Sequence, residues 1–325
     1  MRAEILAALR EESGYISGQE LCERFGVSRT AVWKSINQLK KQGYEIEAVT
    51  NKGYRIVSAP DLLNENELMS VQKTEWIGKK IYYYDVLDST NIQAGRLAQE
   101  GADHGTLVVA GRQEAGKGRR GRGWESPADT GVFMTLILRP EIEPGNASML
   151  TLVAALAVVK GIAALTQLKP LIKWPNDIVV NKKKVCGILT EMDAQIDYVN
   201  HIVVGIGINV QNREFPGEID KIATSLYLEC GRKTNRAALI EAVCEEFERY
   251  YEKYMETQDL SRIVEEYNHF LINFNQKVRI LDPREPYEGI ALGVTNRGEL
   301  IVDTDGKRRL VTSGEVSVRG VYGYV

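Results

Sequence analysis

The sequence predicts an α+β protein of several domains: an N-terminal winged helix-turn-helix, a central mixed α/β sheet domain and a C-terminal SH3-like β-barrel. Three observations support this prediction. Two short amphipathic helices and an alternating hairpin come first, apolar strands and helices then alternate, and short strands separated by turns fill the end. The expected domains are 1–62, 63–274 and 275–325. A chain of 325 residues, 44% hydrophobic and 26% charged, can bury such cores without disulfides.

The composition is typical of a cytoplasmic protein. The cysteines and histidines form no C-x-x-C or H-x-x-x-H pair, so we expect reduced thiols and no structural metal site. The N-terminus reaches acidic residues before a long apolar run can form, unlike a signal peptide. The longest apolar run, residues 149–159, is too short to span a bilayer and fits a buried helix. We therefore expect no membrane partner.

Residues 17–43 predict two short helices joined by a tight turn. Ser17 and Glu20 form a capping box, and Gly26 tolerates the left-handed conformation that ends a helix. Ser28 caps the second helix, which closes at Gly43. The side chains expected to point inward are Leu21, Phe25, Ala31, Ile36 and Leu39. This is the helix-turn-helix pattern, in which the second helix enters the major groove of DNA.

A hairpin follows the helices and predicts a wing. The alternating runs "YEIEAV" and "GYRIV" are joined by "TNKG", which places Asn51 and Gly53 at the tip. Lys52 and Arg55 add positive charge where a phosphate would lie. Residues 1–60 also carry more basic than acidic side chains, although the whole chain has a formal net charge of −3.

The second helix and the wing supply the expected DNA contacts. Arg29 and Asn37 suit base edges, whereas Thr30 and Lys34 suit phosphates. Trp33 could be partly core. The full candidate set is Ser28, Arg29, Thr30, Trp33, Lys34, Asn37, Lys52 and Arg55. The alternative is a protein–protein module with a solvated charged face.

From about residue 62 the pattern becomes a mixture of strands and helices. Strands are expected in "KIYYYDVLDSTN", "GTLVVAGRQ", "GVFMTLILRP", "LIKWPNDIVVNKKKVCGILTEM" and "HIVVGIGINV". Helices are expected in "NIQAGRLAQEG" and at about 147–166, 235–257 and 259–271. Residues 277–322 then predict short strands with turns at 296–298 and 305–306, which fit a small SH3-like barrel.

"AGKGRRGRGW", residues 115–124, is the most unusual stretch of the middle domain. It lies between two strands, and neither Ser nor Thr follows Lys117, so it does not fit a Walker loop. A disordered nucleic-acid arm is normally terminal or longer. The remaining interpretations are a plain solvated loop and a mobile loop whose amides and guanidinium groups wrap a small anion.

Five motifs in order resemble those of biotin–protein ligases. They are "LDSTN" (87–91), "GRQEAGKGRRGRGW" (111–124), "KWPND" (173–177), "KKVCGILTE" (183–191) and "GIGINV" (205–210). With the winged helix in front, the whole chain is similar to the bifunctional ligases that also repress the biotin operon. The resemblance implies a class II synthetase-like central domain.

The resemblance implies a two-step reaction that uses biotin, ATP and Mg²⁺. The biotin carboxylate attacks the α-phosphate of ATP, and a lysine of a biotin carboxyl carrier domain, of acetyl-CoA carboxylase or another biotin-dependent carboxylase, attacks the resulting biotinyl-5′-AMP. A homodimer carrying the adenylate would bind operator DNA. No protein nucleophile is required, so catalysis would depend on positioning and on stabilising charge at phosphorus.

The resemblance also implies roles for individual residues. The head of biotin would be bound by Ser89, Thr90, Asn91 and Gln113. The biotin carboxylate and the phosphates would be covered by Lys117, Gly118, Arg119 and Lys184, of which the three cations are the expected catalytic residues. Many family members have Arg at the position of Lys117, so its planar fork is lost here.

Other motif residues have secondary or alternative roles. Asn209 would reach the nucleotide, and Gly205 and Gly207 would permit close approach of the ligand. Asn176 and Asp177 could serve Mg²⁺ or the nucleotide, or simply shape a turn. Ser89 or Thr90 could also be a helix cap. The side chains expected to be solvated loop or turn charges are Arg120, Arg122, Lys182 and Lys183.

Two other functions fit parts of the sequence. The chain could be a transcription factor whose middle domain only senses a ligand, but Lys184 and the complete basic loop argue against this. It could also be a lipoate or octanoate enzyme of the same superfamily. The basic loop and the lack of a catalytic cysteine constellation favour biotin.

Overall fold

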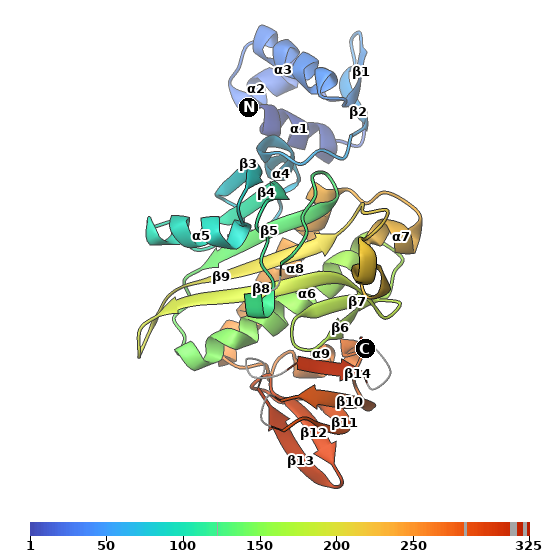
Figure 1. Cartoon of the computed structure of the whole chain (residues 1–325). Helices are drawn as coiled ribbons and strands as arrows, with labels where there is room; N and C mark the ends of the chain where they lie inside the picture. The colour runs from blue at the N-terminus through green and yellow to red at the C-terminus, as the bar shows by residue number, and fades with distance from the viewer. Residues whose placement is uncertain (122, 283–284, 313–316, 321–323) are drawn as a thin grey trace. The chain divides into compact units, whose positions relative to one another are not determined.

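The structure, a computed structural model, folds into two compact units (Figure 1). It describes residues 1–121, 123–282, 285–312, 317–320 and 324–325. The first unit holds Met1–Lys73 and Asn235–Glu241, and the second holds Thr74–Thr234 and Ala242–Val325. The first unit is therefore built from two separate stretches of chain.

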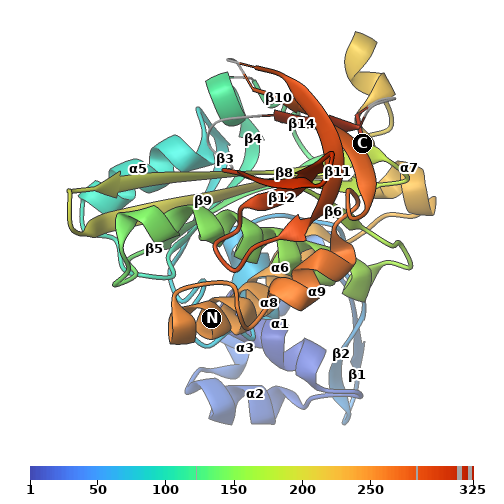
Figure 2. The same cartoon turned by 90° about the horizontal axis from the view of Figure 1, so that it is seen from below.

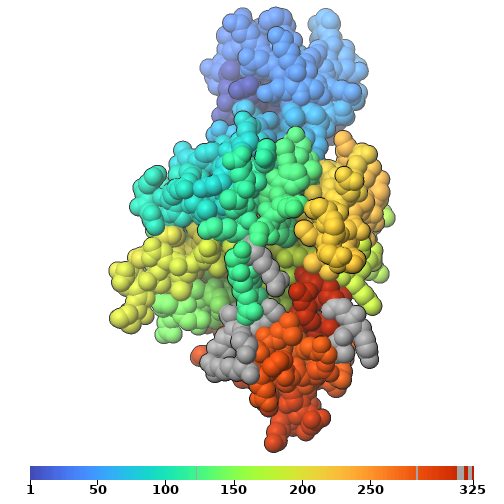
Figure 3. Space-filling view, viewed as in Figure 1, coloured from blue at the N-terminus to red at the C-terminus, as the bar shows by residue number. Residues whose placement is uncertain are grey.

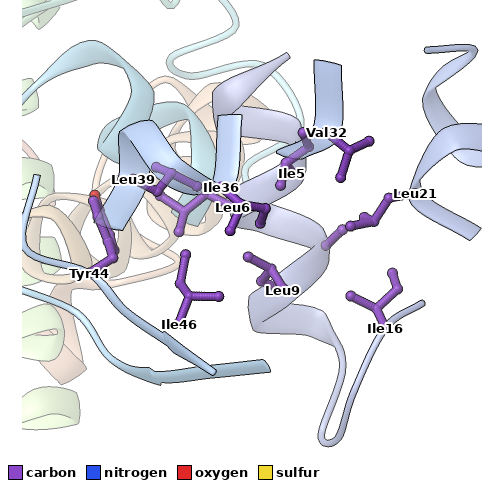
Figure 4. Close-up of a cluster of buried hydrophobic side chains, with 11 residues drawn as sticks. Ile5, Leu6, Leu9, Ile16, Leu21, Val32, Ile36, Leu39, Tyr44 and Ile46 are labelled. Atoms are coloured by element: carbon purple, nitrogen blue, oxygen red, sulfur yellow. The ribbon is translucent and has the colours of Figure 1, made fainter. Parts of the chain in front are cut away.

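The first unit is a winged helix-turn-helix, as predicted. Its elements are α1 (Arg2–Glu11), α2 (Gly18–Phe25), α3 (Arg29–Lys41), β1 (Glu45–Val49), β2 (Gly53–Ser58) and α4 (Glu65–Val71). Apolar side chains from α1, α2, α3 and β1 form its core, in which Leu6, Leu9 and Ile36 are buried (Figure 4). This burial supplies most of the driving force for folding the unit.

The predicted helix caps are confirmed. The Glu20 amide donates to Ser17 Oγ at 3.0 Å, and Gly26 ends α2 in the left-handed conformation. The Ala31 amide donates to Ser28 Oγ at 3.2 Å.

One of the side chains predicted to point inward does not do so. Ala31 is half-exposed and Val32 is buried instead. Val32 shares a face with Ile36 and Leu39, because residues four and seven positions apart lie on the same side of a helix.

The predicted wing is also confirmed. Asn51 adopts a φ of 64° in the turn, and Val49 pairs with Gly53. The chain before α2 joins the sheet, since Ile16 and Tyr54 exchange two backbone hydrogen bonds of 2.9 Å. A Cβ on Gly53 would lie 2.0 Å from the Ile16 carbonyl oxygen, so only glycine fits there.

Buried ion pairs fix the segments that follow the wing. Arg10 lies 2.6 Å from the Glu67 carboxylate, which is fully buried and also accepts a hydrogen bond from Tyr44. The Arg236 side chain, at the start of α8 (Arg236–Thr257), lies 3.1 Å from Asp61. A buried carboxylate requires such partners, so α4 is firmly part of this unit.

The second unit is built on a seven-stranded mixed sheet of order β3-β4-β5-β9-β8-β7-β6. Its strands are β3 (Ile81–Leu87), β4 (Leu107–Gln113), β5 (Gly131–Leu138), β6 (Leu171–Lys173), β7 (Asp177–Val180), β8 (Lys183–Ala194) and β9 (Val199–Asn209). Only the β3–β4 pair among these described strands is parallel. The carboxyl ends of β3, β4 and β9 therefore lie at the same edge as the start of β5 and β8.

Helices cover both faces of this sheet. The helices of this unit are α5 (Thr90–Gln99), α6 (Leu150–Leu165), α7 (Leu226–Cys230), the part of α8 (Arg236–Thr257) that follows Glu241, and α9 (Val264–Phe270). The 3₁₀ turns are η1 (Arg119–Gly121), η2 (Pro144–Met149) and η3 (Gly217–Lys221). Figure 2 shows α5 on one face and α6 with α9 on the other. The arrangement agrees with the predicted mixed α/β domain.

The longest apolar helix lies in the core of this unit. Among the described residues, Pro144–Leu165 is the one helical segment long and apolar enough to cross a bilayer, and 67% of its most apolar window is buried inside the protein. α6 packs on β6, β7, β8 and β9. Its apolar side chains are therefore covered by the sheet.

The C-terminal region is an open antiparallel sheet of order β13-β12-β11-β10-β14. Its strands are β10 (Gln276–Leu281), β11 (Tyr287–Val294), β12 (Leu300–Thr304), β13 (Lys307–Val311) and β14 (Ser317–Gly320). The strands and turns are as predicted, but the predicted barrel is not closed. Within the described ranges β14 pairs with β10 and does not pair with β13, so the sheet does not close.

The wing provides a test of the fold. We expect Gly53→Ala to separate β2 from the Ile16 segment, because the new Cβ would collide with the Ile16 carbonyl. Hydrogen exchange at the Ile16 and Tyr54 amides should accelerate about tenfold or more. The control is Gly26→Ala, which has a φ of 63° but open space around it and should cost only about 1 kcal/mol. Equal exchange at both amides in the two variants would contradict this account.

Candidate functional site

Two adjoining cavities lie at the edge of the central sheet where the motif residues end. The smaller has a volume of about 50 Å³ and the larger about 330 Å³. They share a wall made by Gly118, Arg119, Trp124, Asn176 and Lys184. A molecule in one cavity would thus meet a molecule in the other at this wall.

The structure brings the predicted site residues together. The smaller cavity is lined by Ser89, Thr90, Asn91, Gln113, Lys117, Gly118, Arg119 and Lys184. The larger is lined by Gly118, Arg119, Lys184 and Asn209. The strand order explains the gathering, because these residues come from the ends of β3, β4, β8 and β9 at one edge of the sheet.

Glycines form the floor of the smaller cavity. Gly187 on β8 pairs with Gly207 on β9, and Gly205 lies two residues away on the same face. A Cβ on Gly205 would lie 2.0 Å from Asn91 Oδ1, and a Cβ on Gly207 would lie 2.9 Å from Trp124 Nε1. The glycines therefore permit close approach of Asn91 and Trp124.

The polar residues that follow β3 are hydrogen-bonded mainly to other groups of the protein. The Asn91 amide donates to the Leu189 carbonyl at 3.1 Å and to Glu191 at 2.7 Å, and its oxygen accepts from Thr135 at 2.8 Å. The Thr90 amide donates to Gln113 Oε1 at 2.8 Å. Asn91 and Thr90 are therefore fixed in orientation by their own framework.

Ser89 differs from these neighbours. It stands at the N-cap of α5, yet within the described residues its side chain accepts no capping hydrogen bond. It is 2% exposed and lines the smaller cavity. The Gln113 side chain donates to Ser126 Oγ at 2.9 Å, which ties β4 to the end of the basic loop.

The basic loop is closed at its base and crosses the site. The Glu114 amide donates to the Leu87 carbonyl at 2.9 Å, and the Trp124 amide donates to the Gly116 carbonyl at 2.8 Å. Lys117 pairs with Gly123 as an isolated bridge. Figure 3 shows this green segment as a narrow ridge on the surface.

The loop's cations have different environments. Arg119 is partly buried and donates to Asn176 Oδ1 at 3.0 Å, whereas Lys117 and Arg120 are exposed. The predicted loop charge Arg122 lies outside the described residues. Arg119 is therefore the cation of the described loop that is fixed at the shared wall.

A network of charges lines the larger cavity. Lys184 Nζ lies 2.6 Å from Asp177 Oδ1, and Asp177 Oδ2 accepts a hydrogen bond from Tyr324. Burial acts to raise the pKa of Asp177, but Lys184, Lys173 and the Tyr324 hydrogen bond outweigh it and hold that pKa below its usual value. Burial lowers the pKa of the Lys173 amine to about 8.

The structure adds four residues to the predicted site. Trp124, Lys173, Arg319 and Tyr324 all line the larger cavity, and Trp124 also lines the smaller one. Trp124 and Lys173 belong to the quoted motifs, and the glycines of β8 and β9 were a signal that a large ring could lie against them. Arg319 and Tyr324 come from the C-terminal region, where no pattern in the sequence pointed to the site.

The Trp124 side chain has features of a ligand contact. Its ring lies against Gly187 and Gly207, and Lys184 Nζ is 5.1 Å from the ring centre. Its indole N–H is buried and, among the described residues, has no hydrogen-bond partner. Such a group is normally satisfied by water or a ligand.

Carboxylates are sparse around these cavities. The described part of the chain holds no group of three or more His, Cys, Asp or Glu side chains suited to a metal ion. Asp177 and Glu125 line the larger cavity. This donor set fits Mg²⁺ that arrives with phosphates, since Mg²⁺ commonly takes one or two carboxylates and the phosphate oxygens.

The first unit carries a second candidate surface, on α3 and the wing. The residues Ser28, Arg29, Thr30, Trp33 and Lys34 are exposed, and Asn37 is half-exposed. Trp33 is 58% exposed, so the suggestion that it is partly core is wrong. It lies beside Lys34 and Asn37 in a shallow surface groove.

The cations of this surface are held by neighbours. Arg29 donates to Gln19 at 2.9 Å, and Arg55 pairs with Glu47 at 2.8 Å. Lys52 and Arg55 lie over the Tyr15 ring. The positive wing is thus held in place before any partner binds.

Three family matches cover the three regions. The Biotin/lipoate A/B protein ligase family matches residues 83–209, an HTH domain matches residues 2–55, and the Biotin protein ligase C terminal domain matches residues 274–319.

Whole-chain comparisons agree with these matches. The chain is 43% identical to the bifunctional ligase/repressor BirA of Bacillus subtilis, covering 94% of each chain. It is 28% identical to that of Escherichia coli, covering 97% of this chain and 96% of the relative.

A solved structure supports the same assignment for the catalytic region. The biotin protein ligase of Aquifex aeolicus, in complex with biotin and ATP, superposes with a TM-score of 0.65 at 28% identity and covers 74% of this chain and 99% of that one. The matches run through the loop, the glycine-bearing strands and the helix-turn-helix described above. The chain therefore belongs to the bifunctional ligase/repressor family of biotin protein ligases.

Proposed function

We propose that the protein joins biotin to ATP and transfers the biotinyl group to a lysine of a carrier domain. The observation that carries this proposal is the pair of adjoining cavities that share Arg119 and Lys184. A carboxylate in the smaller cavity would face the α-phosphate of a nucleotide in the larger one. Two anions repel each other, so cations at their meeting point are the chief requirement of this reaction.

The smaller cavity would hold biotin. A neutral ureido ring needs donors and acceptors and not charge, and the cluster Ser89, Thr90, Asn91 and Gln113 offers them. Ser89 is best placed for direct contact, because its buried hydroxyl is not used as a helix cap. The Trp124 ring would form an apolar wall, and its indole N–H would gain a partner.

The shared wall would bring the two reactants together. Arg119 and Lys184 would contact the biotin carboxylate and the α-phosphate, and Lys117 and Gly118 would cover them from the loop. The Lys117 ammonium acts as a point charge and cannot make the bidentate contact of an arginine.

The larger cavity would hold ATP. Asn209 would support the nucleotide, although its amide already donates to the Thr224 carbonyl at 3.1 Å. Lys173 and Arg319 would contact phosphates, and Asp177, with Glu125, would hold Mg²⁺. Bound Mg²⁺ would neutralise phosphate charge. Asn176 instead positions Arg119, because its side chain bonds both that residue and the Ile188 carbonyl.

The chemistry then follows in two steps. A carboxylate oxygen of biotin attacks the α-phosphorus, a P–O bond forms, and pyrophosphate leaves. The amine of the carrier lysine attacks the acyl carbon, AMP leaves, and an amide results. Lys184 and Arg119 would stabilise the negative charge that builds on the phosphate oxygens.

The cysteines do not support the lipoate or octanoate alternative. Cys186 is the cysteine nearest Lys184 in sequence, and it is fully buried on β8. Burial raises the pKa of its thiol well above the usual value. A buried neutral thiol is a poor nucleophile.

A direct assay tests the enzymatic proposal. The pure protein is incubated with ATP, Mg²⁺ and labelled biotin, with and without a biotin carboxyl carrier domain. We expect labelled biotinyl-5′-AMP in both reactions and a labelled carrier in the second. Binding of biotin with neither product would instead favour a protein that only senses its ligand.

The loop contact gives a second prediction. Arg119→Ala removes the guanidinium fixed to Asn176, so biotinyl-5′-AMP should leave the enzyme about ten times faster or more, as expected for losing a hydrogen bond to a charged ligand. Release is followed after dilution into unlabelled ligand. Arg112→Ala is the control, because Arg112 is exposed at the base of the same loop. Release as slow as in the control would rule out this role.

We further propose that the first unit binds operator DNA as a homodimer when biotinyl-5′-AMP is bound, and so represses transcription in the cytoplasm. The exposed face of α3 and the fixed cations of the wing support this proposal. α3 would enter the major groove, where Arg29 and Asn37 would meet base edges. Thr30, Lys34, Lys52 and Arg55 would contact phosphates, and Ser28 would start the helix at the groove.

Two variants separate these DNA contacts. Lys34→Ala should weaken binding to all sequences and reduce the slope of log Kd against log salt by about 1. Asn37→Ala should reduce discrimination between operator and unrelated DNA by about 1–3 kcal/mol. DNA selected by the wild-type protein with biotin and ATP serves as the operator. Arg24→Ala, which removes an exposed cation of α2 that pairs with Glu11 of α1, should change neither quantity.

A further inference from the structure

The end of the chain contributes an aromatic side chain to the larger cavity. The Tyr324 hydroxyl donates to Asp177 Oδ2, and the Tyr324 ring centre lies 3.9 Å from Lys173 Nζ. The guanidinium carbon of Arg319 lies 5.1 Å from the same ring centre. One side chain thus contacts three charged groups of the site.

These contacts fix the orientation of the Asp177 carboxylate. The two oxygens of Asp177 are divided, with Oδ1 toward Lys184 at 2.6 Å and Oδ2 toward Tyr324. The carboxylate therefore cannot rotate without breaking one of the two contacts. Lys173 is only 5% exposed, and a cation–π contact is strongest for such a desolvated ammonium.

We propose that Tyr324 is a positioning residue for the nucleotide: its ring holds the Lys173 ammonium, and its hydroxyl fixes the carboxylate that orients Lys184. The inference rests on the proposed function, because it takes the larger cavity to receive ATP. Tyr324 acts through Lys173 and Asp177, and it need not touch the reacting atoms.

The contacts favour positioning over stacking on the adenine. The ring is already engaged by Lys173 and Arg319, and its hydroxyl is engaged by Asp177. A ring that left these partners to stack on a base would release two cations and a carboxylate. Tyr324 is better suited to fix the Lys173 and Asp177 side chains, which would otherwise adopt several orientations.

The experiment compares Tyr324→Phe, Tyr324→Leu and the control Tyr287→Leu in the full chain. Tyr287 is a half-buried tyrosine on β11 whose ring lies 4.7 Å from Arg309, away from the residues that line the cavity. Biotin-dependent pyrophosphate release is measured as a function of the ATP concentration and of the biotin concentration, and biotin binding is measured separately.

We expect the KM for ATP to rise about threefold in Tyr324→Phe and about tenfold in Tyr324→Leu, as for loss of a charge-assisted hydrogen bond and of a buried cation–π contact. The KM for biotin should stay within about twofold in both, since these contacts lie in the larger cavity.

Two results would overturn the proposal. One is a KM for ATP like that of Tyr287→Leu in both Tyr324 variants. The other is an equal rise in both KM values with weakened biotin binding, which indicates general damage. Tyr324→Phe alone decides the matter if Tyr324→Leu does not fold. A wild-type protein that binds biotin but releases no pyrophosphate contradicts the proposed function itself, and it is recognised before any variant is compared.

Discussion

Two adjacent strands of the central sheet carry glycines where they border the site, and much of the site depends on the space that these glycines leave. Gly187 and Gly207 are paired across β8 and β9, and the Trp124 ring lies against both. Gly205 admits the Asn91 side chain in the same way. Glycine costs conformational entropy in a strand, and here that cost is offset by packing that no larger residue would allow.

The charges around the larger cavity are balanced by few groups. Lys173, Lys184 and Arg119 approach one another near Asp177, a carboxylate of the cavity lining whose side chain is 13% exposed. Cations brought this close repel one another unless an anion lies between them. Asp177 supplies this anion in the free protein, and phosphates would supply further negative charge. The site is thus prepared for anions although the chain as a whole is acidic.

Local patterns predicted most of the elements, because caps, turns and periodicity act over a few residues. Ser17, Gly26 and Asn51 behave as expected for this reason. The gathering of the motif residues at one sheet edge depends on strand order, which a local pattern does not contain; only the resemblance placed them in one site. Tyr324 was missed because it reaches the site through folding of the C-terminal region. Val32 was missed because the pattern favoured its neighbour Ala31 as the inward residue of the first helical turn. Ile36 and Leu39 are buried, as predicted.

The start of α8 has a consequence for how the protein can be divided. Residues 235–241 belong to the unit that carries the helix-turn-helix, although they are far from it in sequence. Arg236 is 2% exposed, and its side chain lies 3.1 Å from Asp61. A cut that removes the N-terminal residues takes away this carboxylate together with the rest of the first unit's N-terminal stretch, so the start of α8 loses the residues with which it forms a compact unit. A division of the chain that keeps the first unit intact must therefore include both of its stretches, which a single cut cannot do.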